Sequence, residues 1–184
     1  MSNNLSNPDG ARSWLERCRA GNYYGRLNVF NYVLLLKDII YFTPHPVPVE
    51  RTIDRIACYA SVVGDAAARV RMGIYADDGT GNPGALLVDG GEMNFSSGVG
   101  IKAAVVALTL PTPLVWLAFT QTFTAVSPTV AIASGAEGCP LGVGGDLGAI
   151  GGGTVANAYG ALPAAAPAIT TLSANPVILA VRRA

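Results

Sequence analysis

The chain has 184 residues, of which 12 are Lys or Arg, 12 are Asp or Glu and one is histidine, His45. This length suits one domain, or one domain with an arm, and excludes two full domains. The balanced charge argues against nucleic acid as a partner, and a single histidine excludes His-rich metal sites and leaves most hydrolytic mechanisms without their usual base.

No part of the sequence has the pattern of a membrane span or a secretory signal. The long apolar run at residues 103–119 contains Pro111 and Pro113, which would break a spanning helix. The N-terminus lacks the basic and apolar regions of a signal peptide. We therefore expect a protein that is made in a cytosol and has no membrane partner. We also expect its cysteines to be buried free thiols: Cys18, Cys58 and Cys139.

Residues 1–46 are predicted to form an N-terminal arm. Residues 7–21 have the pattern of a short helix, and residues 22–42 are rich in the β-branched and aromatic residues of strands. Three prolines in residues 43–48 are predicted to end these strands, because proline lacks an amide donor. His45 lies between two of them and is predicted to occupy a solvent-facing turn with a structural role.

Residues 47–184 are predicted to form an all-β domain. Within residues 68–75, apolar and other residues alternate with the period of two that is typical of a half-buried strand. Residues 77–84 have the composition of a turn. Further strands are expected at residues 51–63, 85–89, 101–110, 114–123, 129–133 and 176–182. Many short strands with Gly and Pro turns predict an antiparallel β-sandwich of jelly-roll type, with these residues in its core: Met72, Ile74, Val105, Trp116 and Phe119.

The charged residues are distributed unevenly along the chain. Only four follow Lys102, and these are Glu137, Asp146, Arg182 and Arg183. Soluble monomers rarely expose large apolar patches, so part of this half is expected to be buried between copies of the chain. Residues 135–167 are mostly Gly, Ala and Pro, and the sequence leaves two interpretations open for them: a closely packed interface or a mobile loop.

Two sequence patterns resemble functional motifs, but both are better explained as turns. Residues 79–84 match the letters of a dinucleotide-binding motif, although a strand follows where that motif needs a helix. Asp77, Asp78, Asn82 and Asp89 carry oxygens that calcium prefers, but their spacing is not that of a calcium-binding loop. We predict no enzymatic activity, no cofactor and no metal.

Three motifs occur in order between residues 51 and 119. They are Arg51-Thr-Ile-Asp-Arg-Ile56, then Arg71-Met-Gly-Ile-Tyr-Ala-Asp-Asp-Gly-Thr-Gly-Asn-Pro-Gly-Ala-Leu-Leu-Val-Asp89, then Leu114-Val-Trp-Leu-Ala118. This order resembles a β-rich domain that recurs in structural proteins of tailed bacteriophages. The resemblance implies a non-catalytic, jelly-roll-like module on the virion surface, either a capsid decoration (cement) protein or part of a tail fibre. A receptor-binding module for host-surface carbohydrate is the competing class.

A free-standing subunit of 184 residues is expected to fit the cement role better than a tail fibre. The resemblance then implies a homotrimer at local threefold positions of the shell, with the major capsid protein as its partner. The predicted contact residues combine an apolar helix face with basic and aromatic side chains of the arm: Arg12, Trp14, Leu15, Arg17, Cys18, Arg19, Tyr23 and Tyr24.

Overall fold

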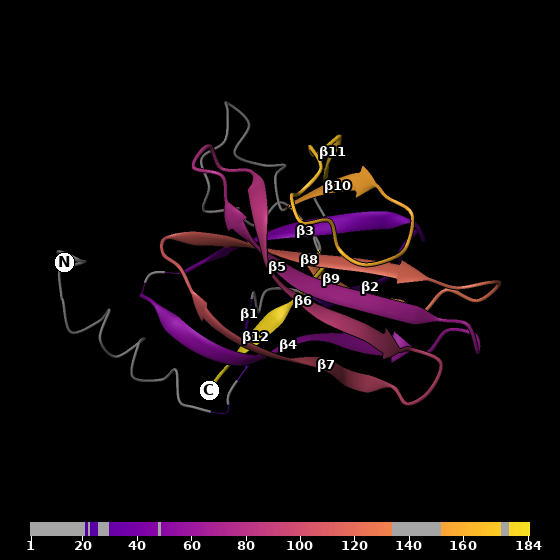
Figure 1. Ribbon diagram of the computed structural model, residues 1–184. Coiled ribbons are helices and arrows are strands. Elements are labelled where there is room, and N and C mark those ends of the chain that lie inside the picture. The colour runs from indigo at the N-terminus through magenta and orange to yellow at the C-terminus, as the bar shows by residue number, and fades with distance from the viewer. Residues whose placement is uncertain (1–20, 22, 26–29, 48, 134–151, 174–176) are drawn as a thin grey trace, which may run out of the picture.

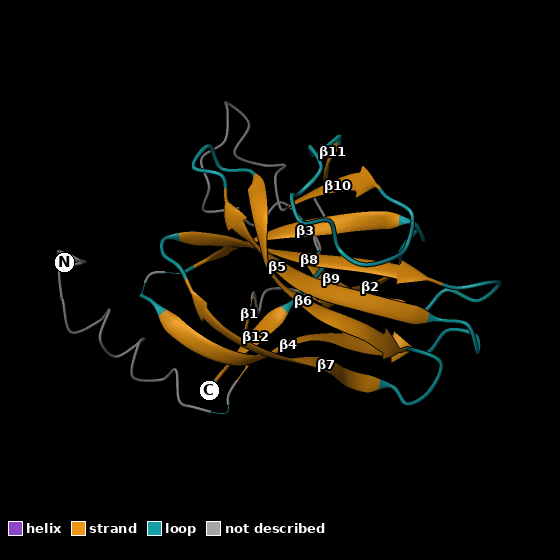
Figure 2. Ribbon diagram, viewed as in Figure 1, coloured by secondary structure: helices purple, strands orange, loops and turns teal. Residues whose placement is uncertain are grey.

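Two antiparallel sheets lie face to face in the computed structural model, which describes residues 21, 23–25, 30–47, 49–133, 152–173 and 177–184 (Figure 1). Each sheet has six strands, and the elements formed by the described residues are all strands (Figure 2). The predicted antiparallel β-sandwich is therefore confirmed. The helix predicted at residues 7–21 falls almost entirely outside the described residues.

The first sheet is organised around the long strand β4. One edge of β4 pairs with β7 from Arg51 to Ala60, and the other edge is shared by β12 and β9. Strands β1 and β2 extend the sheet beyond β12 and β9. The bounds of its strands are β1 Tyr23–Gly25, β2 Phe30–Leu34, β4 Arg51–Val62, β7 Gly100–Leu110, β9 Thr129–Ala133 and β12 Ala180–Arg183.

The second sheet has the order β11-β10-β3-β8-β5-β6. Its strands are β3 Ile39–Pro46, β5 Arg69–Asp77, β6 Pro83–Asn94, β8 Leu114–Thr122, β10 Gly152–Ala156 and β11 Thr171–Ser173. The turn predicted at residues 77–84 joins β5 and β6 as a hairpin. Gly79 and Gly81 have φ values of 87° and 85° there, a conformation that residues with a Cβ rarely adopt.

The main core fills the space between the two sheets. Met72 and Ile74 from β5 and Phe119 from β8 are completely buried in it, as predicted. Val105 was predicted to be buried as well, and this was wrong, because its side chain is 70% exposed. Its neighbours Ala104 and Val106 point inward instead. A strand with apolar residues at consecutive positions does not reveal which alternate set faces the core.

A second, smaller core covers the outer face of the second sheet. Leu162, with residues from β3, β5, β8 and β10, packs there around Trp116, which is 4% exposed. Residues 157–169 cross this face and are held by hydrogen bonds from Leu86 N to Ala164 O and from Ala166 N to Gly84 O, each 2.8 Å long (Figure 1). Trp116 is therefore a core residue as predicted, but of this outer core.

Strand β3 continues through the prolines that were predicted to end it. It pairs with β8 as far as Pro46, whereas β10 pairs only with residues 39–42. Val47 N donates a hydrogen bond to Pro113 O on the β8 side. Amides at alternate positions point away from β8, so Pro44 and Pro46 lie where the ladder with β8 needs no donor. His45 is consequently in a strand, not in the predicted solvent-facing turn.

The described part of the predicted arm belongs to both sheets. Strands β1 and β2 extend the first sheet, and β3 lies between β10 and β8 in the second. The range 39–46 therefore does not precede the sandwich as an extended segment but contributes a strand inside it. The β-branched and aromatic residues of this range predicted strands. The place of these strands in the sheets could not be predicted, because strand order depends on pairings between residues distant in sequence.

Gly73 in β5 allows residues 157–169 to approach the second sheet. A Cβ atom at this position would collide with the Leu162 side chain and lie 2.8 Å from the Val88 carbonyl oxygen. We expect Gly73→Ala to lower the free energy of unfolding by about 1–3 kcal/mol through overpacking, measured by urea denaturation. Gly160→Ala is the control, because a Cβ there meets nothing within 4 Å. Equal stability of the two variants would contradict this packing.

Candidate functional site

Most of the predicted contact residues of the arm lie outside the described residues: Arg12, Trp14, Leu15, Arg17, Cys18 and Arg19. Tyr24 is described by its backbone, which lies opposite Val181. The Tyr23 ring contacts its own sheet, with its centroid 6.0 Å from the guanidinium carbon of Arg182. Arg182 Nε in turn donates to Asp54 Oδ1 at 2.8 Å, and this pairing lowers the pKa of the Asp54 carboxyl.

The acidic residues of the β5–β6 turn hold the turn itself. Asp78 Oδ1 accepts hydrogen bonds from the Thr80 hydroxyl and from the amides of Thr80 and Asn82, and these bonds lower the pKa of Asp78. Asp77 accepts from the amide of Gly79 and from Trp116 Nε1. Within the described part of the chain, no group of three or more His, Cys, Asp or Glu side chains is placed to hold a metal ion. The interpretation of this segment as a turn is confirmed.

Cys58 is a buried free cysteine, as predicted. Burial raises the pKa of its thiol to about 12, so the nucleophilic thiolate is scarce near neutral pH. Cys18 and Cys139 lie outside the described residues. Cys58 therefore acts as a small apolar core residue rather than as a reactive group.

The outer face of the first sheet carries a row of exposed apolar side chains on three strands. We call these residues the outer row: Tyr32 and Leu34 from β2, Tyr59 from β4, and Ile101 and Val105 from β7. Tyr59 pairs directly with Ile101, and the ring centroids of Tyr59 and Tyr32 are 6.2 Å apart. The side chains of the outer row are between 42% and 70% exposed. Contiguous exposed apolar surface of this kind is typical of interaction sites.

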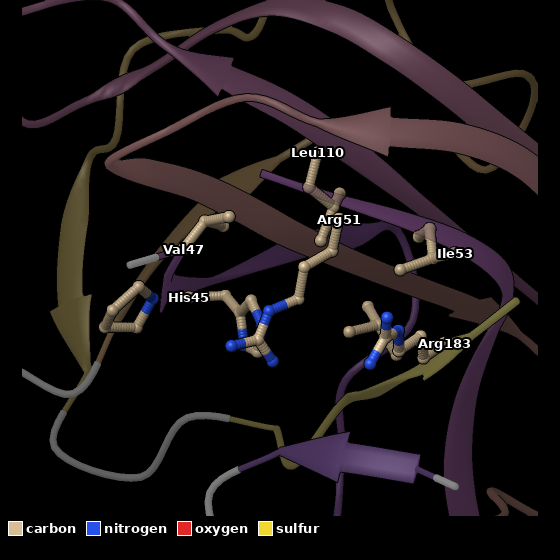
Figure 3. Close-up of a pocket in the computed structure, with 8 residues that line it drawn as sticks. His45, Val47, Arg51, Ile53, Leu110 and Arg183 are labelled. Carbon is tan, nitrogen blue, oxygen red and sulfur yellow. The ribbon is translucent and has the colours of Figure 1, made fainter. Parts of the chain in front are cut away.

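A small pocket lies where β3 of the second sheet approaches β4, β7 and β12 of the first (Figure 3). Its cavity volume is about 20 Å³, far below that of typical sites for small organic molecules. Apolar side chains form much of its lining, together with the basic residues His45, Arg51 and Arg183. The guanidinium groups of Arg51 and Arg183 point to the same side of the pocket (Figure 3).

Burial and the nearby Arg51 lower the pKa of His45 from 6.5 to about 4. The imidazole is therefore neutral at pH 7 and can both donate and accept a hydrogen bond. Sequence patterns singled out His45 but not the two arginines. Arg51 and Arg183 lie at opposite ends of the sandwich domain in the sequence, and only the pairing of β4 with β12 brings them together.

No protein-family model matches this sequence, no curated protein is significantly similar to it, and no solved structure resembles its fold closely enough to count as a match. Among the described residues, no helix is both long enough and apolar enough to span a membrane. The functional argument therefore depends on the surfaces of the protein itself.

Proposed function

We propose that this protein is a non-enzymatic structural subunit that decorates and stabilises a phage capsid as a cement protein on the virion surface. The observation that carries the proposal is the outer row, an apolar surface on a face of the sandwich that the described residues leave exposed. A protein that acts by packing against other subunits needs such a surface. The major capsid protein would be its second partner.

The positions of the three phage-like motifs support the same role. They occupy β4, the β5–β6 hairpin and β8, which are paired elements of the two sheets. Asp89, at the end of the second motif, accepts a hydrogen bond from the Leu162 amide in residues 157–169. Trp116, in the third motif, donates a hydrogen bond to Asp77 at the start of the β5–β6 turn. The residues that carry the resemblance thus have structural tasks in the sandwich, which agrees with a packing module rather than a catalytic one.

The outer row also supports self-association. Apolar surface removed from water contributes about 25 cal/mol per Å², so pairing the row with another copy stabilises an oligomer. We propose a homotrimer, because the local threefold positions of an icosahedral shell suit three copies of a decoration protein. The outer row lies on β2, β4 and β7, so contacts between copies would involve the first sheet.

Analytical ultracentrifugation of the full chain tests the oligomer. We expect a trimer at micromolar concentration, and we expect Ile101→Glu to weaken association at least about 100-fold, because it places a charge directly opposite Tyr59 in the apolar contact. Val126→Glu is the control, since Val126 is 52% exposed but is not part of the outer row. A wild-type monomer at these concentrations would contradict self-association.

Co-sedimentation with purified phage capsids that lack the protein tests the cement role. We expect the wild-type protein and Val126→Glu to pellet with capsids and to raise the temperature at which the capsids open. A protein that forms trimers but does not bind capsids would leave self-association standing and would remove the cement proposal.

Receptor binding is the second candidate, and one observation favours it. The exposed rings of Tyr32 and Tyr59 lie side by side on the outer row, and adjacent aromatic rings are suited to contact the apolar faces of sugars. Glycan-array binding that is lost in Tyr59→Ala, together with no binding to capsids, would favour a carbohydrate-binding module of a tail fibre.

A further inference from the structure

The pocket between the two sheets concentrates positive charge and hydrogen-bond donors on one side. Arg51 and Arg183 contribute two guanidinium groups that point the same way, and the His45 ring lies close enough to the Arg51 guanidinium to feel its charge (Figure 3). The residues that line the pocket include no acidic side chain. Its electrostatic character therefore favours an anion over a cation or a neutral group.

Arg51 has hydrogen-bonding capacity that the described protein groups leave unused. Its Nη2 atom is buried and has no hydrogen-bond partner among the described residues. A buried donor without an acceptor costs free energy, and the cost is larger when the donor belongs to a charged group. An acceptor that entered the pocket would thus be stabilised by a guanidinium group that is not already saturated.

The size of the pocket restricts what can enter it. A cavity of about 20 Å³ holds roughly one water-sized group, so only the head of a ligand fits, while the rest stays outside. A carboxylate is planar and matches the fork of an arginine with two parallel hydrogen bonds. A tetrahedral phosphate can also bind an arginine fork, but it is bulkier than a carboxylate and fits a cavity of this size less well.

We propose that the pocket lined by His45, Arg51 and Arg183 is a binding site for a carboxylate. Arg51 donates from its guanidinium fork, Arg183 supplies a second positive charge at the mouth, and neutral His45 donates from a ring N–H. The carboxylate is either a free small acid or an Asp or Glu side chain of a partner protein. This site is distinct from the outer row, so the proposal does not depend on the cement role.

The single histidine of the chain provides a specific reporter, because long-range proton–nitrogen NMR spectra contain one set of imidazole signals from this protein. We expect sodium acetate at pH 7 to shift the His45 signals with saturation, whereas sodium chloride at equal ionic strength has little effect. Equal shifts with chloride, or tighter binding of phosphate than of acetate, would overturn the proposal.

Variants of the pocket test the role of each cation. Arg51→Gln is expected to raise the dissociation constant for acetate at least about tenfold, and Arg51→Lys, which keeps the charge but loses the fork, should also weaken binding. The control is Arg69→Gln, because Arg69 is an arginine of β5 outside the pocket. If Arg51→Gln does not fold, Arg183→Gln at the exposed mouth serves instead. Unchanged acetate binding in the folded variants would overturn the proposal.

A blocked peptide with a single Glu distinguishes the two sources of the carboxylate. Binding of the peptide at least about tenfold tighter than acetate, and lost with Glu→Gln in the peptide, would assign the site to the side chain of a partner. Similar affinities for the two would assign it to free small acids. Failure of both ligands to perturb His45 would overturn the carboxylate site, whatever the result of the capsid experiments.

Discussion

Replacing Trp116 with Ala is expected to lower the free energy of unfolding by about 3–5 kcal/mol. The indole is 4% exposed and fills the outer core beneath residues 157–169, where the covering segment cannot collapse completely into the space left behind. The substitution also removes the donor to Asp77 Oδ1, which lies 3.1 Å from Nε1. Urea denaturation followed by far-UV circular dichroism measures the effect without relying on indole fluorescence.

Two controls separate burial from aromatic character. Trp116→Phe keeps much of the apolar volume and should cost less than Trp116→Ala. Tyr59→Ala removes an aromatic side chain that is 42% exposed, so we expect a change of less than about 1 kcal/mol in the monomer. A cost below about 1 kcal/mol for Trp116→Ala would show that residues 157–169 do not cover the second sheet.

Replacing Asp89 with Ala is expected to cost about 2–4 kcal/mol, because this carboxylate joins three parts of the fold. It accepts hydrogen bonds from Arg71 Nη1 at 2.9 Å, from the Gly91 amide at 2.8 Å and from the Leu162 amide at 3.1 Å. Removal of the carboxylate leaves a partly buried guanidinium without its partner and detaches the covering segment from β6. Hydrogen exchange at the Leu162 amide should accelerate along with the loss of stability.

Glu92→Ala is the matched control for Asp89→Ala. Glu92 also lies on β6 and pairs with an arginine of β5, but its distance to Arg69 is 3.7 Å and its side chain is 47% exposed. Surface pairs of this kind contribute little, so we expect a cost below about 1 kcal/mol. Equal effects of the two substitutions would contradict the special role of Asp89.

The strands from β4 to β9 could be predicted because turn residues bound them and β-branched and aromatic residues are frequent in them, although the clearest alternation in polarity is that of β5. The β5–β6 hairpin is the clearest case, since its Asp, Gly and Pro residues have conformations or hydrogen bonds that only a turn requires. In contrast, β10 lies in a segment rich in Gly and Ala, which carries no period of two. Its pairing with β3 depends on contacts more than a hundred residues apart, which local patterns do not encode.

The candidate sites were less predictable than the fold. The prolines on either side of His45 led to the prediction of a turn where the structure has a strand. Prolines are tolerated there because one edge of β3 has no ladder partner beyond residue 42, and the sequence does not show this. Ile101 and Val105 of the outer row lie in an apolar run whose inward and outward positions are chemically alike. The uneven distribution of charge directed attention to the half of the chain after Lys102, whereas four of the five residues of the outer row precede Lys102.

The two sides of the sandwich place different limits on sequence divergence. Leu114 to Gln121 of β8 are all buried, since this strand has the main core on one side and the outer core on the other. Strand β7 alternates between buried and exposed positions along much of its length. Descendants of this sequence could therefore change the exposed residues of β7 and acquire new surface contacts. A change at any buried position of β8, in contrast, requires compensating changes in the residues packed around it.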